Sequence, residues 1–132
     1  MMKLYAPNSY WNATKEERKA VCNGCGAKGG INVPDTVYGL SITQSCNIHD
    51  WMFKEGVTYA DMMFANAIFM LNLTIEIIAG SNWITKPMRL MRATKYFLAV
   101  IQFGSDAYWV NKEPNDDMSI TFSGTFGEIE RV

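Results

Sequence analysis

The sequence has little of several features that mark common protein classes. It has one histidine and three cysteines among 132 residues. Three is an odd number, and too few for a disulfide scaffold, so at most one internal bridge forms and one thiol remains over. The formal net charge is −1, so the overall balance does not point to nucleic acid as a partner. Any function must therefore rest on local chemistry.

Long uninterrupted apolar runs are also missing. Residues 1–12 hold one lysine and no apolar run of the length that a secretory signal needs. We therefore expect a protein that stays in the cytoplasm or leaves the cell without a cleaved signal. The most apolar segment, Met62 to Ala79, is interrupted by Asn66, Asn72 and Glu76, which would be costly at bilayer depth. It is predicted to be a core helix that does not span a membrane.

The length and the hydrophobic content of 48% predict a single domain over residues 1–132 with a continuous core. Capping boxes indicate where two helices begin: Thr14 with Glu17 opens a helix to about residue 21, and Ser41 with Gln44 opens a second, which Gly56 ends. The expected fold is mainly α-helical.

Two longer helices are predicted after Gly56. Thr58 is expected to cap a third helix that ends at Gly80, with an apolar stripe facing the second helix. The stripe consists of Phe64, Ile68, Leu71 and Ile75. Pro87 suits the first turn of a fourth helix, with Gly104 as a break and residues 105–110 as a continuation. The run 119–130 predicts a β-hairpin about Ser123 and Gly124.

The lone histidine lies in "SCNIHDWMFKEG", residues 45 to 56. Cys46, His49, Asp50 and Phe53 stand at i, i+3, i+4 and i+7, along one helix face. An antiparallel third helix would bring Asp61 back toward His49. A carboxylate bonded to one ring nitrogen leaves the other nitrogen free to take a proton from water.

Upstream lies a glycine-rich stretch, "CNGCGAKGG", at residues 22 to 30. Glycines allow a loop to turn its carbonyl groups inward without a steric penalty. Carbonyl oxygens and one carboxylate are ligands that Ca²⁺ accepts, and Asp50 is the carboxylate that we assign to it.

These motifs together resemble the phospholipase A2 superfamily, in its shorter bacterial and viral forms. The family pattern is a Cys-Gly-x-Gly-Gly calcium loop, a helix with Cys-x-x-His-Asp, and an aromatic residue four positions after the histidine. This chain has "CGAKGG" at 25 to 30, "CNIHD" at 46 to 50, and Phe53. The second family aspartate, on the next long helix, is matched by Asp61 in "YADMMF". The likeness covers residues 22 to 69.

The resemblance implies a phospholipase A2-like fold, in which two antiparallel core helices carry the site. It also implies calcium-dependent hydrolysis of the sn-2 ester of a glycerophospholipid at a membrane surface. His49 would be the general base, Asp61 would orient it, and Asp50 would bind Ca²⁺. Calcium and a loop backbone N–H would hold the oxyanion. The carbonyl ligands would come from Gly24, from Gly26, and from Lys28 or Gly29. Cys25 and Cys46 match a pair that is bridged in the family, which leaves Cys22 free.

Two departures from the family pattern bear on the site. The loop is one residue longer, which changes its ligand geometry. Phe53 replaces a tyrosine whose hydroxyl supports the second aspartate in many members, so Tyr59 or Tyr96 would have to supply that group.

Two alternatives compete with this interpretation. Cys22, Cys25, Cys46 and His49 also have the spacing of a structural Cys₃His zinc site in a small interaction protein. Alternatively, a phospholipase-like domain could bind without catalysing. On the enzyme hypothesis, four aromatic residues are candidates for a collar at the membrane interface. They are Tyr10, Trp11, Trp51 and Trp83.

Overall fold

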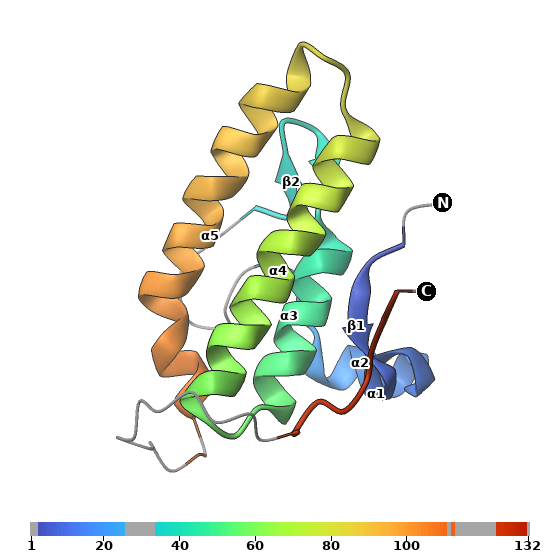
Figure 1. Ribbon diagram of the computed structural model, residues 1–132, viewed down its shortest axis with the longest axis vertical. Helices are drawn as coiled ribbons and strands as arrows, with labels where there is room; N and C mark the ends of the chain where they lie inside the picture. The colour runs from blue at the N-terminus through green and yellow to red at the C-terminus, as the bar shows by residue number, and fades with distance from the viewer. Residues whose placement is uncertain (1–2, 26–33, 111, 113–123, 132) are drawn as a thin grey trace.

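The computed structural model describes residues 3–25, 34–110, 112 and 124–131. This part of the chain is mainly helical (Figure 1). The helices are α1 (Asn8–Asn12), α2 (Lys15–Val21), α3 (Thr43–Glu55), α4 (Tyr59–Gly80) and α5 (Thr85–Trp109). The short strands are β1 (Tyr5–Pro7), β2 (Thr36–Val37), β3 (Leu40–Ser41) and β4 (Ile129–Arg131). The predicted mainly α class is confirmed.

Helix α4 is the centre of the structure, because it packs against α3 on one side and α5 on the other. Its buried side chains belong to two hydrophobic clusters. Phe69, Leu73 and Ile77 pack with Ile42, Cys46 and other residues in the first cluster, and Ala65 and Ile68 pack with Ile48 and Met52 in the second. Three residues of the predicted stripe contribute to the second cluster, but Leu71 is 42% exposed.

Helix starts follow the capping signals in two of three cases. Thr14 and Glu17 form a complete capping box on α2, and Thr58 and Asp61 form one on α4. The predicted box of Ser41 with Gln44 is wrong, since α3 begins at Thr43 and its N-cap position holds Ile42 without a side-chain cap. Ser41 instead belongs to β3, which pairs antiparallel with β2. The predicted end of α3 at Gly56 is confirmed.

Helix α5 begins two residues before Pro87, as expected for a proline in the first turn, but Gly104 does not break it. A glycine inside a helix costs only about 1 kcal/mol relative to alanine. A Cβ at Gly104 would lie 3.5 Å from the Phe53 ring, an ordinary contact distance. The predicted continuation through residues 105–109 is confirmed.

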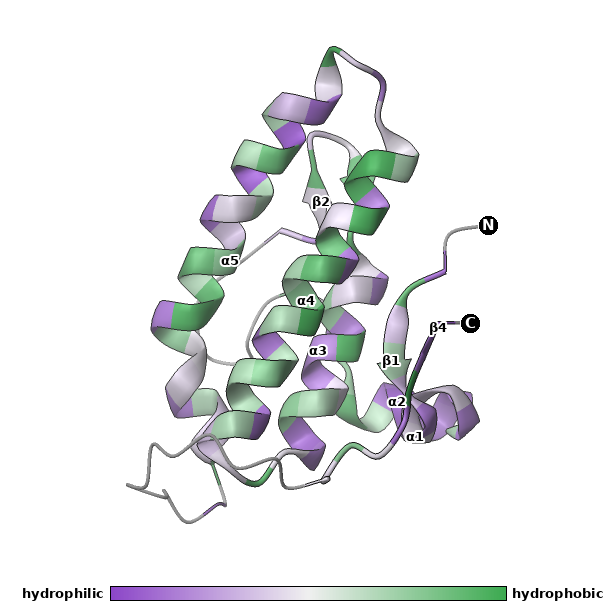
Figure 2. Cartoon of the chain, in the orientation of Figure 1, coloured by the Kyte–Doolittle hydropathy of each residue, from purple (hydrophilic) through white to green (hydrophobic). Residues whose placement is uncertain are grey.

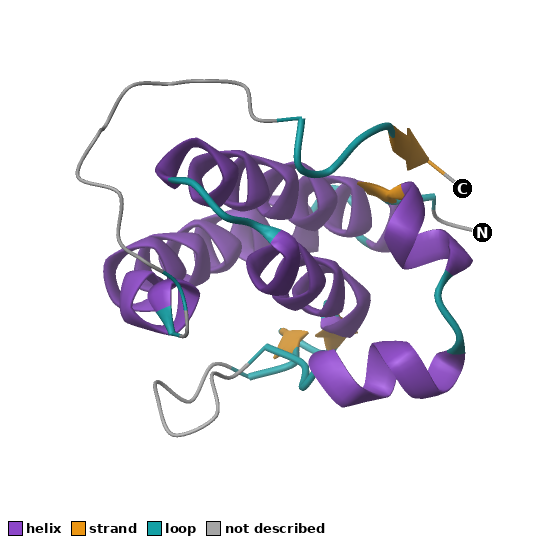
Figure 3. Ribbon diagram, turned by 90° about the horizontal axis from the view of Figure 1, so that it is seen from below, coloured by secondary structure: helices purple, strands orange, loops and turns teal. Residues whose placement is uncertain are grey.

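The two ends of the described chain lie side by side (Figure 3). β4 pairs antiparallel with β1, with Ala6 opposite Glu130. The predicted C-terminal hairpin used residues 119–130, of which 119–123 lie outside the described residues. The second half of that hairpin forms a strand, but its partner is β1 from the N-terminus.

The hydropathy of α4 raises the question of whether this helix could span a membrane (Figure 2). By length and composition alone, Tyr59–Gly80 could cross a membrane, and half of its most apolar window is buried inside the protein. Its polar interruptions all have partners within the fold. Asn72 exchanges two 2.8 Å hydrogen bonds with the Tyr5 backbone, and Glu76 accepts from the Ser45 backbone N–H and hydroxyl.

Candidate functional site

His49 lies in the middle of α3, and its side chain points into the interface with α4. Its ring is 6% exposed and is packed between two phenylalanines, with ring centroids 4.0 Å from Phe53 and 4.7 Å from Phe69. Burial lowers the pKa of His49 to about 4, and the hydrogen bond to Asn66 only partly opposes it. The imidazole is therefore neutral at physiological pH, as a general base must be.

The group bonded to His49 is an amide. His49 Nε2 lies 2.8 Å from Asn66 Oδ1. Because an amide oxygen only accepts hydrogen bonds, Nε2 carries the ring proton and Nδ1 is left with a lone pair. Asn66 thus stands at the ring nitrogen where the sequence analysis expected Asp61.

Asp61 lies in the first turn of α4. Its Oδ2 accepts hydrogen bonds from the backbone N–H groups of Val57 and Thr58, at 2.9 and 3.1 Å, and so completes the capping box. Asn66 stands five residues further on, where antiparallel packing brings α4 opposite the middle of α3. The start of α4 therefore uses one oxygen of the Asp61 carboxylate for its own unpaired N–H groups.

The tyrosine beside Asp61 also differs from the prediction. Tyr96 donates to the Thr36 carbonyl oxygen, so it is engaged elsewhere. Tyr108 of α5 donates to the Thr58 carbonyl oxygen at 2.5 Å and packs edge-on against Phe53. Burial, and then the nearby Asp61 carboxylate, raise the pKa of Tyr108. Tyr108 was not named from the sequence, and it lies on the next helix along the chain.

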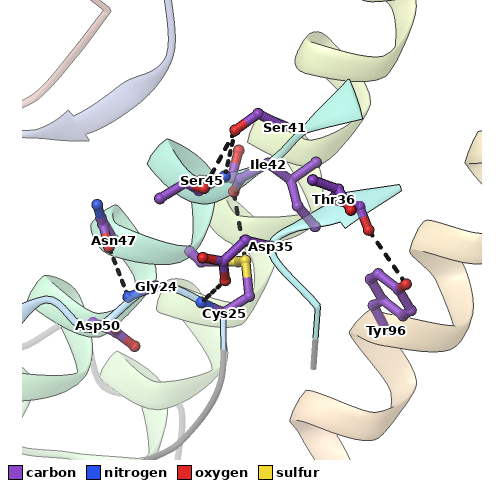
Figure 4. Close-up of a disulfide and its surroundings, with 12 residues drawn as sticks. Gly24, Cys25, Asp35, Thr36, Ser41, Ile42, Ser45, Asn47, Asp50 and Tyr96 are labelled. Carbon is purple, nitrogen blue, oxygen red and sulfur yellow. Dashed lines mark hydrogen bonds between the residues drawn. A yellow bond between two sulfur atoms is a disulfide. The ribbon is translucent and has the colours of Figure 1, made fainter. Parts of the chain in front are cut away.

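The segment before the glycine-rich loop is tied to α3 by a disulfide and by hydrogen bonds (Figure 4). Cys25 and Cys46 are bridged and Cys22 is free, which confirms the pairing that the resemblance implied. The Gly24 N–H donates to Asn47 Oδ1 at 3.0 Å. Gly24 has φ +79°, and a Cβ there would lie 3.0 Å from the Asp35 carboxylate, so the turn requires glycine.

Two carboxylates lie against this segment. Asp50 Oδ2 accepts from the Asn23 N–H at 3.0 Å. Asp35 Oδ1 accepts from the Cys25 N–H at 2.9 Å (Figure 4). Burial raises the pKa of Asp50 to about 7, and the Asp35 charge adds to this effect while the Asn23 N–H opposes it. Asp35 was not predicted. In the sequence, Asp35 is marked only by its position ten residues after Cys25.

The donor chemistry of this corner fits a hard cation. Asp35 and Asp50 supply carboxylate oxygens, the ligands that Ca²⁺ prefers. Within the described residues, no group of three or more His, Cys, Asp or Glu side chains could hold a metal ion. The predicted ligands Gly26, Lys28 and Gly29 lie outside the described residues, so the remaining ligands would have to be backbone carbonyls of the loop. The Gly24 carbonyl is not among the hydrogen-bond acceptors in the described contacts.

The zinc alternative needs three thiolates and His49. In this structure Cys25 and Cys46 are bonded to each other, so two of the four ligands are absent as thiolates. Zinc binding thus stays a prediction for the reduced protein alone.

The described residues form a helical protein with a buried, neutral histidine that is hydrogen-bonded to an amide. Two carboxylates, Asp35 and Asp50, lie against the segment that the disulfide ties to α3. A neutral imidazole with one ring nitrogen free of a proton can accept a proton. No family model matches the sequence, and no curated protein or solved structure matches the chain at a significant level.

Proposed function

We propose that this protein hydrolyses the sn-2 acyl ester of glycerophospholipids in a calcium-dependent reaction. The observation that carries the proposal is the 2.8 Å contact between His49 Nε2 and Asn66 Oδ1. It makes Nδ1 the proton acceptor, and the next residue in the chain, Asp50, faces the predicted calcium loop. The phospholipase A2 resemblance of residues 22 to 69 supplies the substrate class.

His49 acts in both halves of the proposed reaction. Its Nδ1 takes a proton from a water molecule as the water oxygen bonds to the ester carbonyl carbon. When the tetrahedral intermediate collapses, the same proton passes to the departing glycerol oxygen. The products are a fatty acid and a lysophospholipid. Asn66 holds the ring throughout, and the Phe53 and Phe69 rings keep bulk water from the imidazole.

Asp50 and Asp35, with carbonyl groups of the loop, would hold the calcium ion. When bound, calcium supplies positive charge for the ester carbonyl oxygen as it becomes an oxyanion. Asp50 neighbours His49 on α3, and the Cys25–Cys46 bridge ties the loop to that helix. The chain therefore couples the positions of the base and of the cation ligands.

The decisive experiment uses phosphatidylcholine with a labelled sn-2 chain and measures release of labelled fatty acid. We expect release in millimolar calcium and none in excess chelator. His49→Gln should abolish release while calcium binding persists, and Asp50→Asn should abolish both. Asp106→Asn on α5 is the matched control, since it makes the same chemical change on an exposed residue. Equal release in chelator, or unchanged calcium binding by Asp50→Asn, would contradict the proposal.

Two alternatives are separated by the same material. A silent binding domain would bind calcium without releasing fatty acid from any labelled position. A zinc protein would bind one equivalent of zinc after reduction of the Cys25–Cys46 bridge, and substitution of Asp50 would leave that binding unchanged.

A further inference from the structure

The outer face of α5 exposes an unusual amount of apolar surface. Met91 is 68% exposed, Leu98 56% and Phe103 55%, and Trp83, just before the helix, is 83% exposed. Ile84, Met88, Met91 and Leu98 follow the i, i+4, i+7, i+14 spacing of one helix face. The opposite face packs on α4 through Ala93, Leu90, Phe97 and Val100. We call Trp83, Ile84, Met88, Met91 and Leu98 the α5 outer face.

Cations surround this face and acids are missing from it. From residue 85 to 105 the helix carries Lys86, Arg89, Arg92 and Lys95, and its first acid is Asp106. Arg89 is directed inward, with hydrogen bonds to the Gly80 and Tyr38 carbonyls. Arg92 and Lys95 are exposed. Hydrophobic and polar segments alternate along α5 in Figure 2. The positive charge is local to this helix, because the chain as a whole has a net charge of −1.

The placement of Lys95 indicates what covers the face. Lys95 lies four residues after Met91 and three before Leu98, so its charge is in the line of apolar side chains. An apolar groove of a folded protein would have to bury that charge, which is costly without a partner. A second copy would bring the same cations together. At a lipid surface the lysine stem follows the apolar side chains while its ammonium group reaches the headgroups.

We propose that the α5 outer face docks on anionic phospholipid membranes. Trp83, Met88, Met91 and Leu98 enter the boundary between headgroups and acyl chains, and Arg92 and Lys95 contact anionic headgroups. This replaces the collar expected from the sequence. Tyr10 is buried, the Trp11 indole donates to the Glu130 carbonyl, and the Trp51 indole donates to the Ser9 hydroxyl, so of the four only Trp83 points into solvent.

The test is binding to vesicles in calcium-free buffer with chelator, so that it does not depend on hydrolysis. Full-length protein is sedimented with vesicles of two compositions, phosphatidylcholine alone and phosphatidylcholine with about 30% phosphatidylserine. The phosphatidylserine gives the second vesicles a negative surface potential. We expect binding to the anionic vesicles, weakened by added salt. Arg92→Gln with Lys95→Gln should weaken it by about twenty-five-fold, at roughly fivefold for each cation near the surface.

Matched variants keep the test specific. Lys15→Gln with Lys19→Gln removes the same charge from exposed positions on α2, and it should change binding by much less. Met91→Gln with Leu98→Gln should weaken binding without changing the unfolding temperature, because both side chains are exposed. Trp83→Phe should remove the blue shift of tryptophan fluorescence on binding.

Three results would overturn the proposal. The first is equal binding to neutral and anionic vesicles, and the second is equal loss in the α2 and α5 charge variants. The third is a concentration-dependent dimer that Met91→Gln with Leu98→Gln dissociates, which would assign the face to a second copy. Hydrolysis of a short-chain phospholipid below its micelle concentration reports on the catalytic site alone, so failure of docking and failure of the proposed function are distinguishable.

Discussion

At the scale of single residues, the site depends on the hydrogen bonds of the polar residues in α4. Asn66, Asn72 and Glu76 interrupt the apolar segment, and each meets a specific polar group in the fold. Buried polar groups are costly unless they are hydrogen-bonded, so each interruption marked a contact with another element. The interruption at Asn66 is the contact with His49, but the sequence does not show which element meets it.

Substitutions of Asn66 test its positioning role. Asn66→Ala should lower kcat by about 10- to 100-fold with little change in KM or calcium affinity, because the ring loses its orientation. Asn66→Asp places a carboxylate at the imidazole, which favours the charged ring. The pKa of His49 should then rise from about 4, and the acid limb of the pH–rate profile should move up by about one to three pH units.

Asp61→Asn is the comparison for this pair. It removes the charge of the α4 capping box, and so should lower the free energy of unfolding by about 1 kcal/mol while activity per folded molecule stays close to the parent. A large loss of kcat in Asp61→Asn together with a normal Asn66→Ala would restore Asp61 as the orienting residue.

Calcium binding should depend on pH through Asp50. Its pKa is raised to about 7 by burial, and only the ionised carboxylate binds the cation. Below pH 7 binding must therefore release a proton, so calcium affinity should rise by up to about tenfold per pH unit as pH increases toward 7, and level off above about pH 8. Titration calorimetry in buffers of different ionisation enthalpy measures both the affinity and the protons released.

Asp35→Asn provides the control for this pH dependence. Removing the Asp35 charge should lower the pKa of Asp50 and move the rise in affinity to lower pH. A calcium affinity that is constant from pH 5 to 8 would exclude Asp50 as the ligand.

At the scale of elements, glycines show where helices end and where they merely pack closely. Gly104 lies inside α5, and a Cβ there would be 3.5 Å from the Phe53 ring, an ordinary contact distance. At Gly56, after α3, a Cβ would be 2.7 Å from the Tyr108 hydroxyl oxygen. A Cβ would therefore fit at Gly104 but would clash at Gly56.

Alanine at these positions should have opposite effects. Gly104→Ala should raise the free energy of unfolding by about 0.5 to 1 kcal/mol, since helix propensity improves without a clash. Gly56→Ala should lower it by about 1 to 3 kcal/mol, because Tyr108 must move from the Thr58 carbonyl. Urea unfolding of the two variants measures both. A destabilised Gly104→Ala would mean that α5 is interrupted there after all.

The disulfide links the loop to α3 and should stabilise the fold. It joins residues 21 positions apart, for which the chain-entropy model gives about 3 kcal/mol. Cys25→Ser with Cys46→Ser should lose about that much in thermal or urea unfolding, whereas Cys22→Ser should be nearly neutral. Peptide mapping that finds all three thiols alkylated in oxidised protein would refute the pairing.

At the scale of the whole molecule, the chain is closed by contacts between its two ends. β4 pairs with β1, the Trp11 indole donates to the Glu130 carbonyl, and Arg131 Nε donates to the Lys3 carbonyl at 2.7 Å. These contacts cover one side of the cluster that also holds Leu4, Ile48 and Phe126. Ile129 of the C-terminal strand therefore packs against the cluster to which Ile48 and Met52 of α3 belong.

Truncation after Glu128 tests this closure. Losing the β4 hydrogen bonds should lower the free energy of unfolding by about 1 to 3 kcal/mol, at roughly 0.5 to 1.5 kcal/mol for each net bond. Arg131→Ala removes only one side-chain bond and should cost less. An unchanged unfolding temperature in the truncated protein would show that the ends contribute nothing to the core.

Local sequence determined much of this protein, and tertiary packing decided the rest. Capping boxes at Thr14 and Thr58 act within one helical turn, so they were readable without a fold, and the spacing of Cys46, His49 and Asp50 placed them on one helix. The partner of His49, the tyrosine near Asp61 and the carboxylate of Asp35 were not readable. Asn66 and Tyr108 come from other helices, so their positions depend on how α3, α4 and α5 pack. Asp35 precedes β2, and only the folded chain brings it to the Cys25 N–H. The strand partner of β4 was hidden for the same reason, because a pairing across more than 120 residues leaves no local pattern.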